Sequence, residues 1–185
     1  MTVILDINLT IDNMTILSIQ KEDVIYVDDY LKNQCRSQKE ELEVGDIYEK
    51  FLEYYVSENE FFLKINDKEN HEILGIIKGR VEFKNPHEAW IWAISLNESI
   101  RSKGIGSIIL KKLSIYLKEE YGVRDFYTRI IKENGSKLKF WTRNGYEIIR
   151  VSEELYKAND KRTNMFILKK SLGRYSNGQI YAMEK

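Results

Sequence analysis

The sequence predicts one domain of mixed α and β structure, an α+β fold built on a central sheet with antiparallel hairpins and one parallel pair of strands. Residues 89–96 are a nearly unbroken apolar run, typical of a strand buried on both faces. Residues 105–117 then carry apolar side chains at helical spacing up to Gly122, a favourable residue just past a helix end. Because the next strand-like segment, 125–131, follows that helix, this strand and 89–96 should run parallel.

The first half of the chain predicts a strand, two helices and a hairpin. Residues 15–19 form the strand, and acidic residues in 21–23 favour a helix start, followed by apolar positions on one helical face. A polar break at 33–43 precedes a second amphipathic helix. The side chains expected on its apolar face are Ile47, Phe51, Leu52, Tyr54 and Tyr55. Residues 61–65 and 73–83 flank a polar turn and predict an antiparallel hairpin.

The second half adds a short helix and a closing hairpin. Asn85 and Pro86 interrupt the chain before the strand at 88–96. Asn134 is a suitable N-cap for a short helix that Asn144 and Gly145 end. Residues 146–151 and 164–169 predict the last hairpin, and residues 171–185 show no clear periodicity.

Composition excludes several classes of protein. The 185 residues, with no repeat and no convincing linker, predict a single domain over 1–185 with its core at about 14–170. The lone Cys35 excludes an internal disulfide and a cysteine metal cluster, so we expect no metal and a reduced, cytoplasmic setting. We expect no signal peptide, and no apolar run reaches bilayer length, so no membrane partner is expected. Net charge is zero without a dense basic run, which argues against nucleic-acid binding.

The segment Arg101-Ser-Lys-Gly-Ile-Gly106 between strand and helix is suited to an anion. Glycines permit close backbone approach, and the first turn of a helix presents unpaired N–H groups. The segment lies in a basic part of the chain, 99–150, while residues 1–60 are acidic, which would suit a polyanion and a cationic amine respectively. The spacing fits neither a P-loop nor a dinucleotide fingerprint. The alternative is a helix start that happens to contain glycine.

Two motifs resemble the GNAT superfamily of N-acetyltransferases. Arg-x-x-Gly-x-Gly after a strand is similar to that family's acyl-CoA pyrophosphate motif, and residues 134–146 are similar to its second motif, Asn-x-x-Ala-x-x-x-Tyr-x-x-x-Gly-Phe. The chain departs from the family at four positions. These are Glu98 where the family often has Pro, Lys137 for Ala, Trp141 for Tyr and Tyr146 for Phe.

The resemblance implies a fold and a cosubstrate. The fold is a mostly antiparallel sheet of about six to seven strands with helices on both faces, in which the central strand is bulged and two parallel strands splay around CoA. The cosubstrate is acetyl-CoA, with pantetheine on the backbone of Ile94, Ser95 and Leu96, and the pyrophosphate on the glycine segment. The residues implied for the glycine segment are Arg101, Ser102, Lys103, Gly104, Ile105, Gly106 and Ser107. Asn134, Phe140 and Trp141 on the short helix complete the implied CoA site.

The implied reaction is acetyl transfer to a primary amine by direct attack in a ternary complex, which would make the protein an acyltransferase. The backbone N–H of Leu96 would stabilise the oxyanion. By residue type, Glu88 and His87 are candidate bases, and the alternative is that both are solvent-exposed residues at the entry of the strand. Trp141 cannot replace the usual Tyr as an acid, because an indole has no usable acidity near neutral pH. Tyr127 is another possible donor.

Two other functions remain open, namely a non-catalytic CoA-binding or interaction domain of the same fold and an unrelated phosphate-binding domain. The identity of the amine and the choice between monomer and homodimer are also open.

Overall fold

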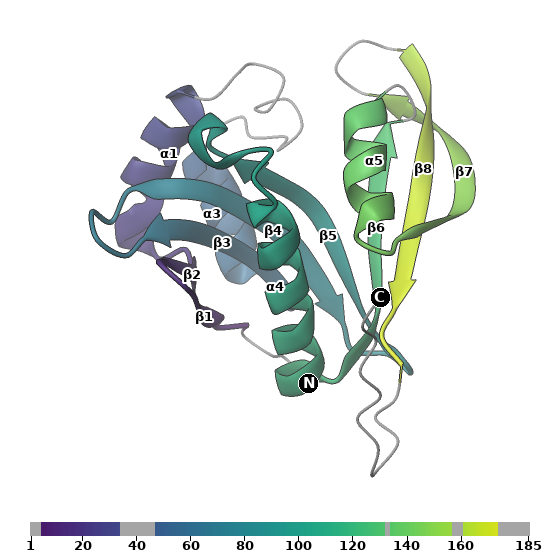
Figure 1. Cartoon of the computed structure of the whole chain (residues 1–185), viewed down its shortest axis with the longest axis horizontal. Coiled ribbons are helices and arrows are strands. Elements are labelled where there is room, and N and C mark those ends of the chain that lie inside the picture. Colours follow the sequence, from purple (N-terminus) through teal and green to yellow (C-terminus); the bar gives the residue numbers. More distant parts are fainter. Residues whose placement is uncertain (1–4, 34–46, 132–133, 157–160, 174–185) are drawn as a thin grey trace.

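The computed structural model describes residues 5–33, 47–131, 134–156 and 161–173. Within them, eight strands form one sheet in the order β1-β2-β3-β4-β5-β6-β8-β7 (Figure 1). The strands are β1 (Asn8–Ile11), β2 (Met14–Ser18), β3 (Glu60–Asp67), β4 (Ile73–Glu82), β5 (His87–Leu96), β6 (Val123–Ile131), β7 (Glu147–Tyr156) and β8 (Lys161–Ser171). Only the β5–β6 pair is parallel, and the predicted fold class is confirmed.

Strand β1 is the element that the sequence does not predict, and it raises the strand number above the expected six to seven. It has only four residues, Asn-Leu-Thr-Ile, and pairs with β2. A run this short, half of it polar, gives little periodicity to detect. The other predicted strands are confirmed, and both strands of the closing hairpin are longer than expected.

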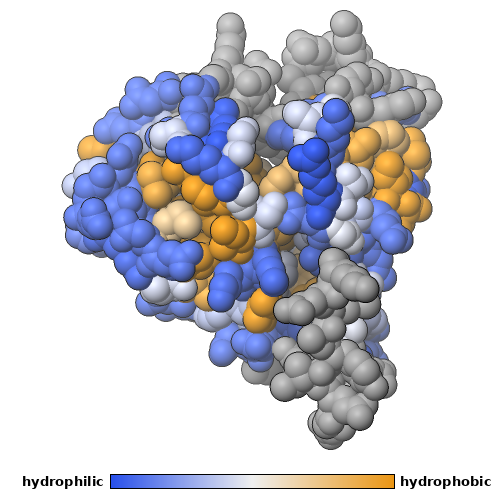
Figure 2. All heavy atoms as spheres, in the orientation of Figure 1, coloured by the Kyte–Doolittle hydropathy of each residue, from blue (hydrophilic) through white to orange (hydrophobic). Residues whose placement is uncertain are grey.

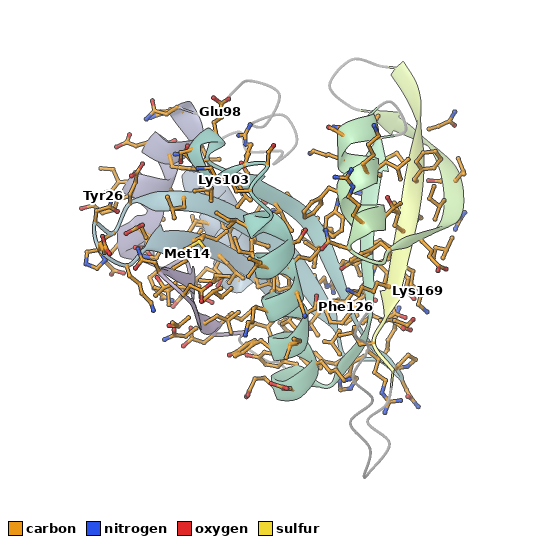
Figure 3. The ribbon with its side chains drawn as sticks, in the orientation of Figure 1. Met14, Tyr26, Glu98, Lys103, Phe126 and Lys169 are labelled. Atoms are coloured by element: carbon orange, nitrogen blue, oxygen red, sulfur yellow. The ribbon has the colours of Figure 1, made fainter. Side chains whose placement is uncertain are left out.

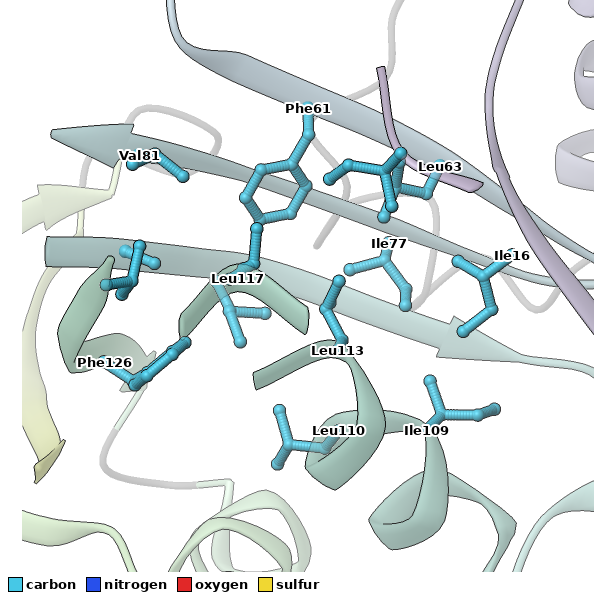
Figure 4. Close-up of a cluster of buried hydrophobic side chains, with 14 of the residues drawn as sticks. Ile16, Phe61, Leu63, Ile77, Val81, Ile109, Leu110, Leu113, Leu117 and Phe126 are labelled. Atoms are coloured by element: carbon cyan, nitrogen blue, oxygen red, sulfur yellow. The ribbon is translucent and has the colours of Figure 1, made fainter. Parts of the chain in front are cut away.

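In the described part of the chain, four helices cover the two faces of the sheet. Helices α1 (Val24–Asn33) and α3 (Ile47–Val56) lie on one face, and α4 (Ile105–Tyr121) and α5 (Gly135–Arg143) lie on the other (Figure 1). Short 3₁₀ turns occur at Lys21–Asp23 and Glu98–Ile100. Figure 4 shows the larger core, in which Ile109, Leu113 and Leu117 of α4 pack beneath Phe61 and Ile77. Helix α4 ends at Gly122, which has φ 66°, as its sequence predicts.

The predicted apolar face of α3 is wrong in part. Phe51 and Tyr54 join the core on the α1 side, but Leu52 is 43% exposed and Tyr55 is 71% exposed. Leu52 follows the buried Phe51 and Tyr55 follows the partly buried Tyr54, and one step along a helix turns a side chain by about 100°. They therefore point away from the sheet. The side chain of Ile47 lies outside the described residues.

Strand β5 is bulged and leaves its parallel neighbour part-way along. Its register with β4 shifts at Trp92, because Lys78 pairs with Ala93 and Gly79 with Ile91. Pairing with β6 stops at Trp90, and in Figure 1 the two strands meet at one end and diverge towards the other. The bulge and the splay that the family resemblance implies are thus both present. The expectation that this strand is buried on both faces holds for only some of its residues, since Trp90 and Trp92 are half-buried.

Strand β7 forms one edge of the sheet. Ile148, Ile149 and Val151 on it are 44%, 54% and 56% exposed, and Figure 2 shows apolar surface in this region, at the right of the view. This surface lies away from the connection between β5 and α4.

Candidate functional site

The connection from β5 to α4 presents a row of unpaired backbone N–H groups. Ser102 has φ 60° and Gly104 has φ 79°, so the chain turns sharply before α4 begins at Ile105. Among the backbone hydrogen bonds of the described residues, none uses an N–H group from Ser102 to Gly106, and the first comes from Ser107 to the Gly104 carbonyl at 3.0 Å. These donors lie at the positive end of a 17-residue helix. The arrangement is suited to an anion.

The two glycines of this connection have different structural roles. A Cβ on Gly104 would meet nothing within 4 Å, so its φ of 79° is the feature that favours glycine there. A Cβ on Gly106 would lie 3.2 Å from Phe140 Cε2 and 3.3 Å from Leu96 Cδ1. Gly104 therefore sets the turn and leaves open space, whereas Gly106 allows α4 to approach β5 and α5 closely.

The cationic side chains of the connection bond to its own backbone. Arg101 Nε donates to the Leu96 carbonyl at 2.7 Å, and Lys103 Nζ donates to the Ser99 carbonyl at 2.7 Å. Arg101 Nη1 also lies 3.8 Å from Glu98 Oε1. Figure 3 places Glu98 and Lys103 in this connection, at the top of the view. Both cations thus stabilise the turn while adding positive charge beside the unpaired N–H groups.

The backbone of Ile94, Ser95 and Leu96 lies beyond the last residue of β5 that pairs with β6. One edge of this segment bonds to β4, and its other edge faces the side from which β6 has diverged. Ile94 and Leu96 pack against the α4 core, whereas Ser95 is 7% exposed. These three residues therefore lie where β5 no longer pairs with β6, and their role in holding pantetheine stays a prediction.

Tyr30 of α1 lies beside Ser95 on the face opposite α4. Burial raises the pKa of Tyr30, and the Ser95 hydroxyl and the Arg101 charge oppose that rise. The two hydroxyls are neighbours without a well-formed hydrogen bond, since Tyr30 Oη has no partner of good geometry within the described part of the chain. Tyr30 therefore stays a neutral phenol near neutral pH.

Helix α5 contacts the connection from the other side. The Asn134 side chain accepts from the Lys137 N–H at 3.3 Å, which confirms the predicted N-cap. Asn134 also lines a shallow surface hollow with Ile131, Gly135 and Ser136. Further along, the Phe140 ring lies against Gly106. The structure thus brings Asn134 and Phe140 to the same end of the sheet as the glycine segment.

Asn144 is a residue of this site that the sequence analysis used only as a helix end. Its Nδ2 donates to Ser107 Oγ at 3.0 Å and to the Phe140 carbonyl at 2.8 Å. Its side chain thus joins the last turn of α5 to the first turn of α4. Asn before Gly is a common stop signal for helices, and nothing in that pattern indicates a contact 37 residues away.

A family model for the acetyltransferase (GNAT) domain matches residues 16–167, most of the chain. The chain belongs to the GNAT acetyltransferase family. This confirms the resemblance drawn from the two motifs.

Solved structures agree with this assignment at the level of the fold. The ribosomal-protein-S5-alanine acetyltransferase from Vibrio fischeri has a TM-score of 0.74 at 13% identity, covering 90% of this chain and 97% of that chain. The spermidine N-acetyltransferase from Vibrio cholerae, in complex with CoA and spermine, has a TM-score of 0.71 at 11% identity, covering 86% and 95%. An acetyltransferase from Salmonella typhimurium that modifies the N-terminal serine of a 50S ribosomal subunit protein has a TM-score of 0.74 at 15% identity, covering 88% and 96%. No curated protein sequence matches the chain.

Trp141 of this GNAT protein is a core residue. Its side chain is 5% exposed and makes edge-to-face contacts with Phe140, at 5.4 Å between ring centroids, and with Tyr146, at 4.8 Å. Burial raises the pKa of Tyr146, and its hydroxyl has no partner of good geometry in the described residues. The indole therefore packs against Phe140 from the core side.

Glu88 and Leu96 lie at opposite ends of β5. They are eight residues apart on an extended strand, which corresponds to about 26 Å. Glu88 forms an ion pair with Lys84 at 2.9 Å and accepts a long hydrogen bond of 3.5 Å from the Tyr127 hydroxyl. A single carbonyl carbon cannot be reached both by this carboxylate and by the Leu96 N–H, so the two expected catalytic roles do not combine.

The remaining candidates near Glu88 have structural contacts. His87 Nδ1 lies 2.8 Å from the Tyr121 carbonyl oxygen, and Tyr127 stacks on Trp90 with 4.9 Å between ring centroids. Within the described residues there is no group of three metal-ligating side chains. No described helix is long and apolar enough to cross a membrane.

Proposed function

We propose that the protein is an acyl-CoA-dependent N-acetyltransferase that transfers an acetyl group from acetyl-CoA to a primary amine. The observation that carries the proposal is the placement of two features at one end of β5. The strand loses its β6 partner after Trp90, and the connection that follows its last residue carries unpaired N–H groups at a helix start. An extended thiol arm ending in a pyrophosphate needs this combination of strand edge and anion site.

The cosubstrate would be held chiefly by backbone. The pyrophosphate meets the N–H groups between Ser102 and Gly106 together with the Ser107 hydroxyl, and the charges of Arg101 and Lys103 favour it. Pantetheine lies along the edge of Ile94 to Leu96 from which β6 has diverged, with Asn134 on the opposite side. Phe140 borders the adenine end, and Trp141 forms the wall behind Phe140.

The reaction is direct transfer within a ternary complex. The amine nitrogen attacks the thioester carbon, the C–S bond breaks, and the amide forms. The departing thiolate takes a proton from water or from a group other than Trp141, and the nitrogen loses its proton to water or a base. A backbone N–H at Leu96 aimed at the carbonyl oxygen would contribute about 2.7 to 4 kcal/mol to the transition state. The distance from Leu96 to Glu88 leaves Glu88 outside this step.

The acceptor is proposed only as a primary amine. The similar structures named for their acceptors act on a ribosomal-protein alanine and on spermidine, which are both amines. Because these two structures are only 13% and 11% identical to this chain, they do not indicate whether its acceptor is a protein N-terminus or a small polycation. The cytoplasmic setting remains a prediction from Cys35, which lies outside the described residues, and monomer or homodimer remains open.

The test has two stages. Calorimetry first measures binding of CoA and of pantetheine, and the proposal requires that CoA bind more tightly because it carries the pyrophosphate. Release of free thiol from acetyl-CoA is then followed with a panel of amines, and mass spectrometry identifies the acetylated product. Absence of CoA binding overturns the proposal.

A non-catalytic CoA-binding domain is the second candidate. It is favoured by Trp141, because a buried indole occupies the place of the family's usual acid. Tight CoA binding without thiol release for any amine would support this alternative. Mass spectrometry of a ligand that co-purifies with the protein would also show whether acetyl-CoA or CoA is bound.

A further inference from the structure

The Asn144 side-chain amide has a defined orientation. The amide atom 2.8 Å from the Phe140 carbonyl oxygen must be nitrogen, because a carbonyl only accepts hydrogen bonds. The same nitrogen lies 3.0 Å from Ser107 Oγ. The backbone N–H of Asn144 is bonded to the Trp141 carbonyl at 3.0 Å, which fixes the residue at the end of α5. Asn144 therefore donates, and Ser107 Oγ accepts.

This bond determines where the Ser107 hydroxyl can point. An oxygen that accepts from Asn144 must direct its own hydrogen elsewhere. Ser114, seven residues further along α4, donates its hydroxyl hydrogen to the Leu110 carbonyl of the same helix at 2.7 Å. No such acceptor for the Ser107 hydroxyl is found among the described residues. Ser107 is half-buried in the first turn of α4, next to the unpaired N–H groups. Its hydrogen is available to a ligand there.

We propose that Asn144 is a positioning residue that holds the Ser107 hydroxyl as a donor towards the pyrophosphate of the cosubstrate. The inference rests on the proposed function and adds a residue on α5 to the anion site on α4. The contact of Phe140 with the neighbouring Gly106 keeps the two helices together at this point. Without the Asn144 amide, the hydroxyl rotates to accept from water or to bond a carbonyl of its own helix, and the ligand loses an oriented donor.

The experiment measures affinity for CoA and for pantetheine in four proteins: the parent, Asn144→Ala, Ser107→Ala and the double variant. Each single variant is expected to bind CoA about 3- to 10-fold more weakly, the range for one hydrogen bond. Pantetheine, which lacks the pyrophosphate, should bind all four equally. The double variant should be no weaker than Ser107→Ala, because Asn144 acts through that hydroxyl. In turnover, KM for acetyl-CoA should rise while kcat and KM for the amine stay unchanged.

Thr142→Ala is the matched control. Thr142 lies on the same turn of α5, is exposed, and bonds only carbonyls of its own helix, Leu138 at 2.9 Å and Lys139 at 3.3 Å. Its loss should leave CoA affinity as in the parent. If Asn144→Ala fails to fold, Ser107→Ala carries the test, because alanine is favoured at a helical position.

Unchanged CoA affinity in folded Ser107→Ala overturns the inference, and so do additive losses in the double variant or an equal loss for pantetheine. These results leave the proposed function intact as long as the parent binds CoA. A parent that binds no CoA overturns both.

Discussion

Arg101 Nε donates a 2.7 Å hydrogen bond to the backbone carbonyl oxygen of Leu96, the last residue of β5. The guanidinium thus joins the strand that would hold pantetheine to the segment that would hold the pyrophosphate. From sequence alone, Arg101 is a positive charge near an anion, whose effect salt should screen. The contact adds a short-range role that salt does not weaken.

Arg101→Lys separates these two roles. Lysine keeps the charge but has no Nε–H in a planar fork, so it cannot reproduce the bond to Leu96. We expect Arg101→Lys and Arg101→Ala both to weaken CoA binding, with part of the loss persisting at high salt. Calorimetry at low and high salt measures this, and thermal unfolding checks the fold. Parent-like affinity of Arg101→Lys at both salt concentrations would show that charge alone matters.

Gly104 offers a test of backbone conformation. Its φ of 79° disfavours residues with a Cβ, but no atom lies within 4 Å of that Cβ position. Gly104→Ala should cost about 1 kcal/mol of folding free energy from strain alone, and Gly104→Asn should cost less, because asparagine tolerates this region. Urea unfolding of the ligand-free protein measures both.

CoA affinity provides the second readout at Gly104. Both variants should lose affinity, because each side chain enters the open space beside the unpaired N–H groups. If Gly104→Asn binds CoA as tightly as the parent, the ligand does not approach this residue.

The sequence predicts the fold better than it predicts contacts within the site. Hydrophobic periodicity and turn residues suffice to predict most helices and strands, because these elements depend on residues that are neighbours along the chain. Gly104 and Gly106 look equivalent in the motif, yet the positive φ of Gly104 and the packing of Phe140 and Leu96 against Gly106 separate their roles. Asn144 contacts Ser107 across two elements, and no local pattern encodes such a pairing. The loss of β6 pairing after Trp90 is also a tertiary feature, and it is implied only by the family resemblance.

Glu88 illustrates a limit of a different kind. Glu88 is a reasonable base by residue type and lies at the start of the strand. A resemblance to the family, however, does not supply the distance from Glu88 to the reacting atoms. Once β5 is known to be extended from His87 to Leu96, strand geometry alone separates Glu88 from the far end. Catalytic assignments need the distance between groups, which a sequence contains only indirectly.

Asp125 should make stability depend on acid pH. This carboxylate of β6 accepts from the Ser171 hydroxyl at 2.6 Å and pairs with Lys169 of β8 at 2.9 Å; Figure 3 labels Lys169. Burial raises the pKa of Asp125. The hydrogen bond from Ser171 and the charge of Lys169 together lower it by more than burial raises it, so the pKa lies below its ordinary value. A lowered pKa stabilises the folded state above the unfolded pKa of about 3.9, and this stability is lost as pH falls through the folded value.

Asp125→Asn should therefore be less stable than the parent at neutral pH, and the difference should shrink once the pH falls below about 4. Urea unfolding across this range measures the two curves. Asp28→Asn is the control, because the ion pair of Asp28 with Lys32 is exposed and such pairs contribute little. A constant gap between parent and Asp125→Asn down to the lowest pH would contradict the linkage.

Trp141 tests whether packing or chemistry explains the departure from the family motif. The indole is 5% exposed between Phe140 and Tyr146, and Phe140 in turn lies against Gly106. Trp141→Phe keeps an aromatic ring in this stack and should retain most of kcat and of CoA affinity. Trp141→Ala leaves a cavity and should cost about 3 to 5 kcal/mol of folding free energy, with weaker CoA binding as Phe140 loses its support.

Steady-state kinetics with an identified amine, measured across pH for both variants, separates the two explanations. If the indole only packs, the pH profile of kcat in Trp141→Phe should match that of the parent, since neither side chain titrates near neutral pH. Trp141→Tyr places a hydroxyl at the position where the family has one, and it should raise kcat only if that hydroxyl reaches the sulfur. A Trp141→Phe variant with normal CoA affinity and almost no turnover would mean that the indole N–H takes part in the reaction, despite its burial in the core.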